Sequence, residues 1–114
     1  MKKLWVDDLR NPLDFVDEGW EWEPSFYGAS KMIQENNYEE ISLDNDLGDE
    51  LGREGKDILN RIEFWLYCNE DFLSNLKKIY VHTANPVAAN VMMSVKENFQ
   101  SKFGIEVIRT PMFD

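Results

Sequence analysis

The sequence predicts an α/β fold, in which a five-stranded, mostly parallel sheet forms the middle layer of a three-layer sandwich. Several short apolar runs have the length of buried strands, and helical patterns lie between most of them. Strands that alternate with helices are typical of βαβ units with right-handed crossovers. The chain has 114 residues, of which 43% are hydrophobic, and this is enough for one domain, residues 1–114, with its own core.

The first half of the chain contains three of the expected strands but only one full helix. An Asn-Pro turn follows the first strand, and the acidic stretch after it ends in Gly19, so we expect an irregular connection instead of a first helix. Ser25 is suited to cap the helix that follows the second strand. The expected elements are strand 3–7, connection 13–19, strand 20–22, helix 26–36 and strand 38–43.

The second half contains two expected helices and the two remaining strands. Asn85-Pro86 is a strong helix start, because Asn caps well and Pro suits the first helical position. Apolar residues recur at every fourth position from Val87 to Phe99, and Gly104 ends this helix. The expected elements are helix 56–69, a short turn at 70–76, strand 78–83, helix 86–103 and strand 105–109. This order describes a small flavodoxin-like sheet whose first helix is reduced and whose last helix is absent.

The charge distribution is uneven along the chain. The net charge is −10, and the excess of acids lies entirely within residues 1–57. Such a chain repels phosphate polyanions at long range, which argues against nonspecific nucleic-acid binding. No apolar run approaches ~18 residues and no secretory signal is visible, so we expect no membrane span and a cytoplasmic protein. The lone Cys68 is expected to be a small core residue.

Polar residues follow directly after four of the predicted strands. The carboxyl ends of parallel strands meet at one edge of the sheet, which is where ligands bind in open α/β folds. We therefore expect a single site assembled from four strand ends. Carboxylates at one edge repel each other unless a cation relieves them, and hard oxygen ligands suit Mg²⁺ or Mn²⁺. The expected metal ligands are Asp7, Asp8, Asp44 and Asp46.

Three short motifs resemble those of response-regulator receiver domains. They are V-D-D at residues 6–8, S-L-D at residues 42–44 and T-A at residues 83–84, while Arg109-Thr110-Pro111 stands where a receiver has its lysine and proline. The longer stretches L-W-V-D-D-L-R-N-P, I-S-L-D-N-D-L-G and V-H-T-A-N-P resemble the cyclic-phosphate-processing receiver domains. This resemblance implies a receiver-like fold and a metal-dependent phosphoesterase that hydrolyses, or opens, cyclic phosphates on RNA ends or nucleotides.

Each remaining polar residue at the strand ends suits a part of this chemistry. The expected catalytic residues are Asp44, Asp46, His82 and Arg109, and the expected substrate-binding residues are Arg10, Thr83 and Asn85. In one hypothesis a metal-bound water attacks phosphorus, and the histidine protonates the leaving ribose oxygen or activates the water. In another, Asp44 attacks first and forms an aspartyl-phosphate. Structural roles stay open: a hydrogen-bonding histidine, an Arg10–acid pair, a helix cap and a turn residue.

Two other functions fit the same sequence. Asp44 could be the phosphoacceptor of a receiver-type signalling module, or the chain could be a non-catalytic binding or inhibitor protein, including a virus-encoded one. The expected partner in the enzymatic case is a small phosphorylated ligand or an RNA end, and the oligomeric state stays open. The aromatic residues around Trp20 and Trp22 fit a core or lid, a partner surface or a stacking site for a nucleobase.

Overall fold

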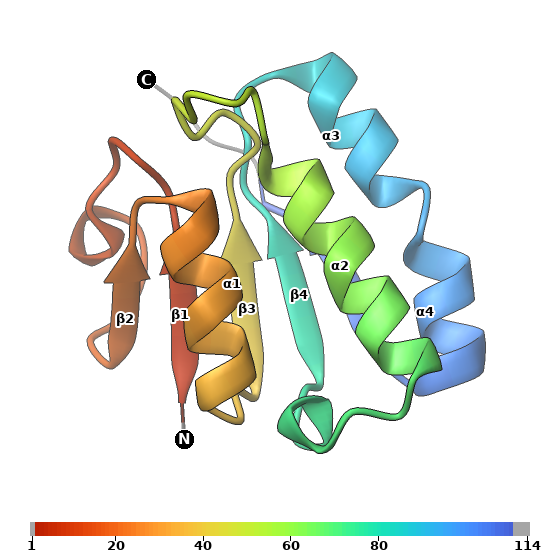
Figure 1. Ribbon diagram of the computed structural model, residues 1–114. Coiled ribbons are helices and arrows are strands. Elements are labelled where there is room, and N and C mark those ends of the chain that lie inside the picture. The colour runs from red at the N-terminus through yellow and green to blue at the C-terminus, as the bar shows by residue number, and fades with distance from the viewer. Residues whose placement is uncertain (1, 111–114) are drawn as a thin grey trace.

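The computed structural model describes residues 2–110 and contains a five-stranded sheet in the order β2-β1-β3-β4-β5 (Figure 1). Every neighbouring pair of strands is parallel, which confirms the predicted α/β class. The reversal of strand order beside β1 is the switch point at which such sheets bind ligands. The strands are β1 (Lys3–Val6), β2 (Trp20–Glu23), β3 (Glu40–Leu43), β4 (Lys78–Val81) and β5 (Glu106–Arg109).

The helices begin and end near the predicted signals. The Ser25 hydroxyl accepts a hydrogen bond from the amide of Gly28 at the start of the first helix, and Gly104 ends the last one with a φ of 67°. The helices are α1 (Phe26–Glu35), α2 (Gly55–Tyr67), α3 (Pro86–Met93) and α4 (Lys96–Phe103), with short 3₁₀ turns η1 (Pro12–Asp14) and η2 (Asp71–Leu73).

All four α-helices cover the same face of the sheet (Figure 1). Side chains alternate along each strand, so one set of strand residues packs against these helices and forms the core. The other face carries Trp5, Ser42 and Tyr80, which are opposite one another on β1, β3 and β4. Within residues 2–110, the η1 connection between β1 and β2 is what lies over this second face, in agreement with the reduced first helix. Pro111 lies outside the described residues.

The helix predicted over residues 86–103 is wrong, because the structure has two helices there. Ser94 donates hydrogen bonds from both its amide and its hydroxyl to the carbonyl of Val91, which tightens the chain and ends α3. Within α3, Ala89 and Met92 face the core, and Val87 and Val91 are 71% and 52% exposed. The break shifts the helical phase, so that Val95 and Phe99 after it pack against the core. The repeat of apolar residues from Val87 to Phe99 is therefore not one helix face: its first two members are exposed on α3, and its last two pack against the core.

The expectation for Cys68 is also wrong. This residue caps the carboxyl end of α2 and is exposed, because the apolar face of α2 lies at Ile58, Leu59 and Ile62, and the helix ends before the cysteine can turn inward. In the part of the chain that the structure describes, no helix has both the length and the apolar content needed to cross a membrane.

Candidate functional site

Three of the predicted acids converge at the carboxyl edge of the sheet. Val6 and Leu43 are register partners on β1 and β3, so the residues after them leave the sheet side by side. The amide of Asp44 bonds to the carbonyl of Val6 at 2.9 Å and fixes this arrangement. As a result, one carboxylate oxygen each from Asp7, Asp8 and Asp44 lies within 4.8 Å of the others. We call these three residues the acidic triad.

Arg10 lies against the triad from the loop after β1. Its Nη1 is 3.6 Å from Asp7 Oδ2 and 3.6 Å from Asp44 Oδ2. The loop is held in place because Asp7 Oδ1 accepts hydrogen bonds from the amides of Leu9 and Arg10, at 2.9 Å each. The guanidinium is thus positioned at the triad while its side chain stays partly exposed, where a phosphate oxygen can reach it.

His82 lies behind the triad and is fully buried. Its Nε2 is 3.0 Å from Asp7 Oδ2, and its Nδ1 is 2.7 Å from the Ser42 hydroxyl. The ring stacks on the Trp5 indole, with the centroids 3.9 Å apart and the planes 9° apart. Both ring nitrogens are therefore engaged inside the protein, and no edge of the imidazole faces solvent.

The charge states of this pair follow from its surroundings. Burial lowers the pKa of His82 and outweighs the opposing effect of Asp7, so the imidazole is neutral at pH 7. Burial by itself would raise the pKa of Asp7, but hydrogen bonds from His82 and from two backbone amides outweigh it and lower this pKa. An ionised Asp7 can only accept, so Nε2 carries the ring proton and Nδ1 accepts from the Ser42 hydroxyl.

The two other triad members resist ionisation. Burial, together with the negative charge of Asp7, raises the pKa of Asp44 to about 6. Burial, with the charges of Asp7 and Asp46, also raises the pKa of Asp8. A nearby cation stabilises the ionised form of carboxylates that are crowded in this way, because it relieves their mutual repulsion. This electrostatic state and the all-oxygen donor set fit a hard divalent cation.

Thr83 and Asn85 lie on the β4 side of the triad. The buried Thr83 side chain hydrogen-bonds to Asp44, and its hydroxyl oxygen accepts from the amide of Asn85. Asn85 caps α3, since its Oδ1 accepts from the amides of Val87 and Ala88. Asn85 itself is exposed, so a bound anion can approach the amino end of α3 from solvent.

The structure does not bring Asp46 and Arg109 into the triad. Asp46 is exposed in the loop after β3, and it acts on the triad only through its charge, which contributes to the raised pKa of Asp8. Arg109 is exposed at the end of β5, opposite Val81 in the sheet register. Both residues lie near the carboxyl edge of the sheet.

Gly48, in the loop after β3, and Gly55, the first residue of α2, shape the site, a role that the sequence analysis missed. Gly48 has a φ of 59°, and a Cβ there would lie 3.1 Å from Asp8 Oδ2. A Cβ on Gly55 would lie 1.8 Å from the carbonyl oxygen of Asp44, so only glycine lets α2 start beside this strand end. The only signal for this role in the sequence is the close spacing of Gly48, Gly52 and Gly55 after the strand.

The sequence analysis also missed the two residues that hold the His82 ring, which are Ser42 through a hydrogen bond and Trp5 through stacking. A serine inside the apolar run I-S-L has no packing role that an alanine would not fill, so its hydroxyl pointed to a buried polar partner. That partner, His82, is 40 residues away in the chain, and only the β3–β4 register reveals it.

Comparison with known proteins agrees with this geometry. The family model described as the cyclic-phosphate processing receiver domain matches residues 2–98. The chain is also similar in fold to a response regulator protein from Burkholderia pseudomallei, whose crystal structure contains a phosphorylated aspartic acid, a calcium ion and citrate. That match has a TM-score of 0.59 and 18% sequence identity, and it covers 98% of this chain but 61% of the other. No curated protein matches the chain in sequence.

Proposed function

The chain belongs to the cyclic-phosphate-processing receiver domain family, and on this premise we propose that it opens cyclic phosphates on nucleotides or RNA ends with the help of a divalent cation. The observation that carries the proposal is the acidic triad with Arg10 beside it, since Nη1 lies 3.6 Å from two of the three carboxylates. Phosphoryl chemistry needs charge neutralisation and a positioned acid or base, and this edge of the sheet offers both.

The cation would be held by Asp7, Asp8 and Asp44. Their oxygens suit Mg²⁺ or Mn²⁺, and the relative of similar fold contains a calcium ion. When bound, such an ion would offset the negative charge of the phosphate oxygens. We expect Arg10 to contribute a second positive charge, because its guanidinium turns toward a phosphate oxygen once the cation neutralises the carboxylates that it contacts now.

Asp44 is proposed as the group that moves a proton. One of its carboxylate oxygens would hold the cation, and the other would be left to accept a proton. It would take a proton from a water molecule whose oxygen forms the new bond to phosphorus. The bond from phosphorus to one ribose oxygen breaks, and that oxygen leaves with the proton from Asp44. The product is a phosphate monoester, and Thr83 orients the carboxylate throughout.

His82 is proposed to act through Asp7 rather than on the substrate. A direct proton donor has to reach the leaving oxygen, whereas both nitrogens of this buried ring are bonded to Ser42 and Asp7. Its role is to keep Asp7 ionised and oriented toward the cation. Asp46 and Arg109 are proposed to contact parts of the substrate that extend beyond the triad, because both are exposed at the same edge.

A second candidate function is phosphoacceptor signalling through Asp44. The specific observation in its favour is the position of Asp44 at the end of β3, next to Thr83 at the end of β4, in a fold that is similar to a response regulator with a phosphorylated aspartic acid. In that case Asp44 attacks the phosphorus of a small phosphodonor such as acetyl phosphate, and the bond from phosphorus to the donor's leaving oxygen breaks, so that acetate departs. Water later hydrolyses the acyl phosphate and releases inorganic phosphate. Acetyl phosphate would then label the wild type but not Asp44→Asn.

The test is a ³¹P NMR assay of 2′,3′-cyclic nucleotides with Mg²⁺, with Mn²⁺ and with EDTA. We expect conversion to one monophosphate isomer only in the presence of a divalent cation, and a loss of at least about 100-fold in Asp44→Asn. Asp71→Asn is the matched control, because this exposed aspartate lies in η2, before β4, at the opposite edge of the sheet. Turnover in EDTA, or equal turnover by both variants, would exclude the proposed mechanism.

A further inference from the structure

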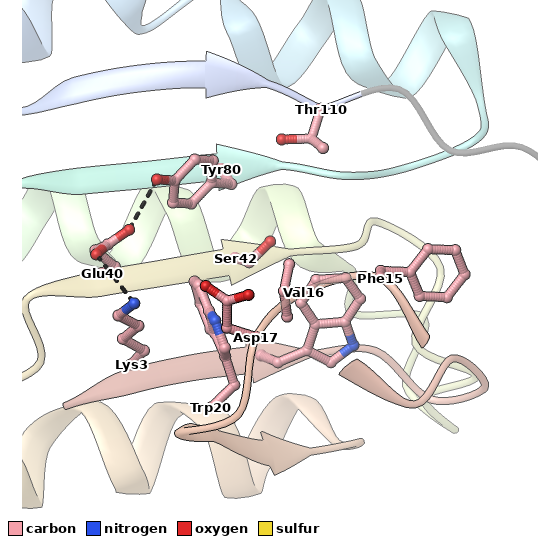
Figure 2. A pocket seen from close by; sticks show the side chains of 10 residues that line it. Lys3, Phe15, Val16, Asp17, Trp20, Glu40, Ser42, Tyr80 and Thr110 are labelled. Atoms are coloured by element: carbon pink, nitrogen blue, oxygen red, sulfur yellow. Dashed lines mark hydrogen bonds and ion pairs between the residues drawn. The ribbon is translucent and has the colours of Figure 1, made fainter. Parts of the chain in front are cut away.

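The face of the sheet opposite the helices contains a hollow of about 330 Å³ (Figure 2). Its origin lies in the register of three strands, because Ser42 on β3 stands between Trp5 on β1 and Tyr80 on β4. A small side chain between two large ones leaves an empty space above it. The volume falls within the range of small-molecule sites, which is about 300–1,000 Å³.

Aromatic rings form the walls of this hollow. Trp20 meets Trp5 edge to face, with centroids 6.2 Å apart, and Tyr80 in the same manner at 6.1 Å. Phe15, from the η1 connection, is stacked parallel to Trp5 at 6.0 Å and lies toward the carboxyl ends of the strands (Figure 2). A space between such rings takes a flat ring, because every flat heterocycle can stack on an aromatic face.

The polar groups in the hollow mainly accept hydrogen bonds. The Ser42 hydroxyl proton is used by His82 Nδ1, so the oxygen of Ser42 on the floor is left as an acceptor. Glu40 and Asp17 add two carboxylates, and the Glu40 carboxylate already accepts a hydrogen bond from the Tyr80 hydroxyl at 2.8 Å and pairs with Lys3 at 3.7 Å (Figure 2). A phosphate would be repelled by these carboxylates, whereas a neutral ring with N–H donors matches them.

We propose that this hollow is a binding site for a flat, N–H-bearing heterocycle of the nucleobase type, which donates a hydrogen bond to Ser42 and stacks against Trp20 and Phe15, beside the buried Trp5. The site goes beyond the proposed cyclic-phosphate chemistry and does not depend on it. It is nevertheless connected to the acidic triad, because Ser42, His82 and Asp7 form a continuous chain of hydrogen bonds of 2.7 and 3.0 Å.

The experiment is an NMR titration of ¹⁵N-labelled protein with adenosine in EDTA, so that neither a metal ion nor turnover is involved. We expect saturable shifts at the indole signals of Trp5 and Trp20. N6-methyladenosine keeps one amino N–H and should bind like adenosine, whereas N6,N6-dimethyladenosine has none and should bind about tenfold more weakly. The donor is tested on the ligand because a change at Ser42 would also disturb His82.

A matched pair of variants tests the walls. Phe15→Ala should weaken adenosine binding about tenfold, whereas Phe64→Ala should leave it unchanged. Both phenylalanines are exposed, at 43% and 65%, but Phe64 lies on α2, on the other side of the sheet. The proposal is overturned if adenosine gives no saturable shifts, if both variants bind equally, or if dimethylation changes nothing.

The heterocycle has two possible sources, and a competition experiment separates them. Adenosine 2′,3′-cyclic phosphate with Mg²⁺ should displace adenosine if the hollow holds the base of the substrate. If both ligands bind at once, the hollow takes a free base or nucleoside as a separate effector. Either result supports the binding site, and a failure of hydrolysis leaves the titration in EDTA unaffected.

Discussion

His82 and Asp7 form a buried pair in which Nε2 lies 3.0 Å from Oδ2, and the Trp5 indole stacks on the imidazole at 3.9 Å. The pair is sealed from solvent, since both side chains are fully buried. A carboxylate in such a place would normally be protonated, and here a neutral histidine and two backbone amides keep it ionised. The arrangement resembles the support that ligands of metal sites receive from residues behind them.

The first prediction concerns this support. His82→Gln should weaken Mg²⁺ binding by about 10- to 100-fold, because a hydrogen-bond partner behind a metal ligand is worth that much. His82→Ala should also lower the free energy of unfolding by about 2–4 kcal/mol, since it leaves a cavity beside Trp5 and removes the hydrogen bond to the buried Oδ2 of Asp7. Calorimetric Mg²⁺ titration and urea unfolding measure the two effects. Mg²⁺ affinity that stays at the wild-type level in folded His82→Gln would contradict the role of the pair.

The second prediction concerns Asp44 and pH. Its pKa is about 6 in the folded protein and near 3.8 when unfolded, so folding favours the protonated form. The metal-free protein should therefore lose stability as pH rises from about 4 to 6, and the loss is complete above that range. Asp44→Asn cannot ionise and should be more stable than wild type at neutral pH, by up to about 3 kcal/mol.

The control for this prediction is the same pair of proteins at low pH and with Mg²⁺. Near pH 4 the advantage of Asp44→Asn should shrink, because Asp44 is then protonated in the wild type as well. Saturating Mg²⁺ at neutral pH should reverse the order, since only the wild type gains from the bound ion. Thermal unfolding at several pH values measures both effects. A variant that is less stable than wild type at neutral pH without metal would refute the assignment.

The third prediction uses two glycines with similar backbones. Gly48 and Gly52 have φ values of 59° and 75°, so alanine at either position should cost about 1 kcal/mol of stability. Only at Gly48 does the added Cβ approach the site, at 3.1 Å from Asp8 Oδ2, whereas nothing lies within 4 Å at Gly52. Gly48→Ala should therefore weaken Mg²⁺ binding several-fold beyond Gly52→Ala. Equal Mg²⁺ affinities would mean that the loop does not position Asp8.

The sequence predicted the parts of the site that follow from strand ends. Apolar runs that stop at Asp7 and Asp44 specify a shared edge, because parallel strands end together. The sequence did not predict that Asp46 stays outside the triad. Successive residues of a loop point in directions that depend on its turn, and the turn here is set by contacts with α2 that lie about ten residues away.

The burial of His82 could not be predicted from the sequence for a similar reason. Its place at the end of β4 was clear, but whether it faces solvent or the protein depends on Trp5 and Ser42, which come from two other strands. The hollow above Ser42 was likewise invisible, because it arises from the register of three strands rather than from any one segment. Aromatic residues in the sequence suggested a stacking site but not its location.

The most direct test of the account is a Mn²⁺ titration followed by electron paramagnetic resonance, in wild type, Asp8→Asn and Asp46→Asn. The triad predicts one Mn²⁺ per chain, an affinity at least about tenfold lower in Asp8→Asn, and at most a few-fold change in Asp46→Asn, whose carboxylate acts only through its charge. Equal affinity in all three proteins, or a larger loss in Asp46→Asn than in Asp8→Asn, would contradict the acidic triad as the cation site.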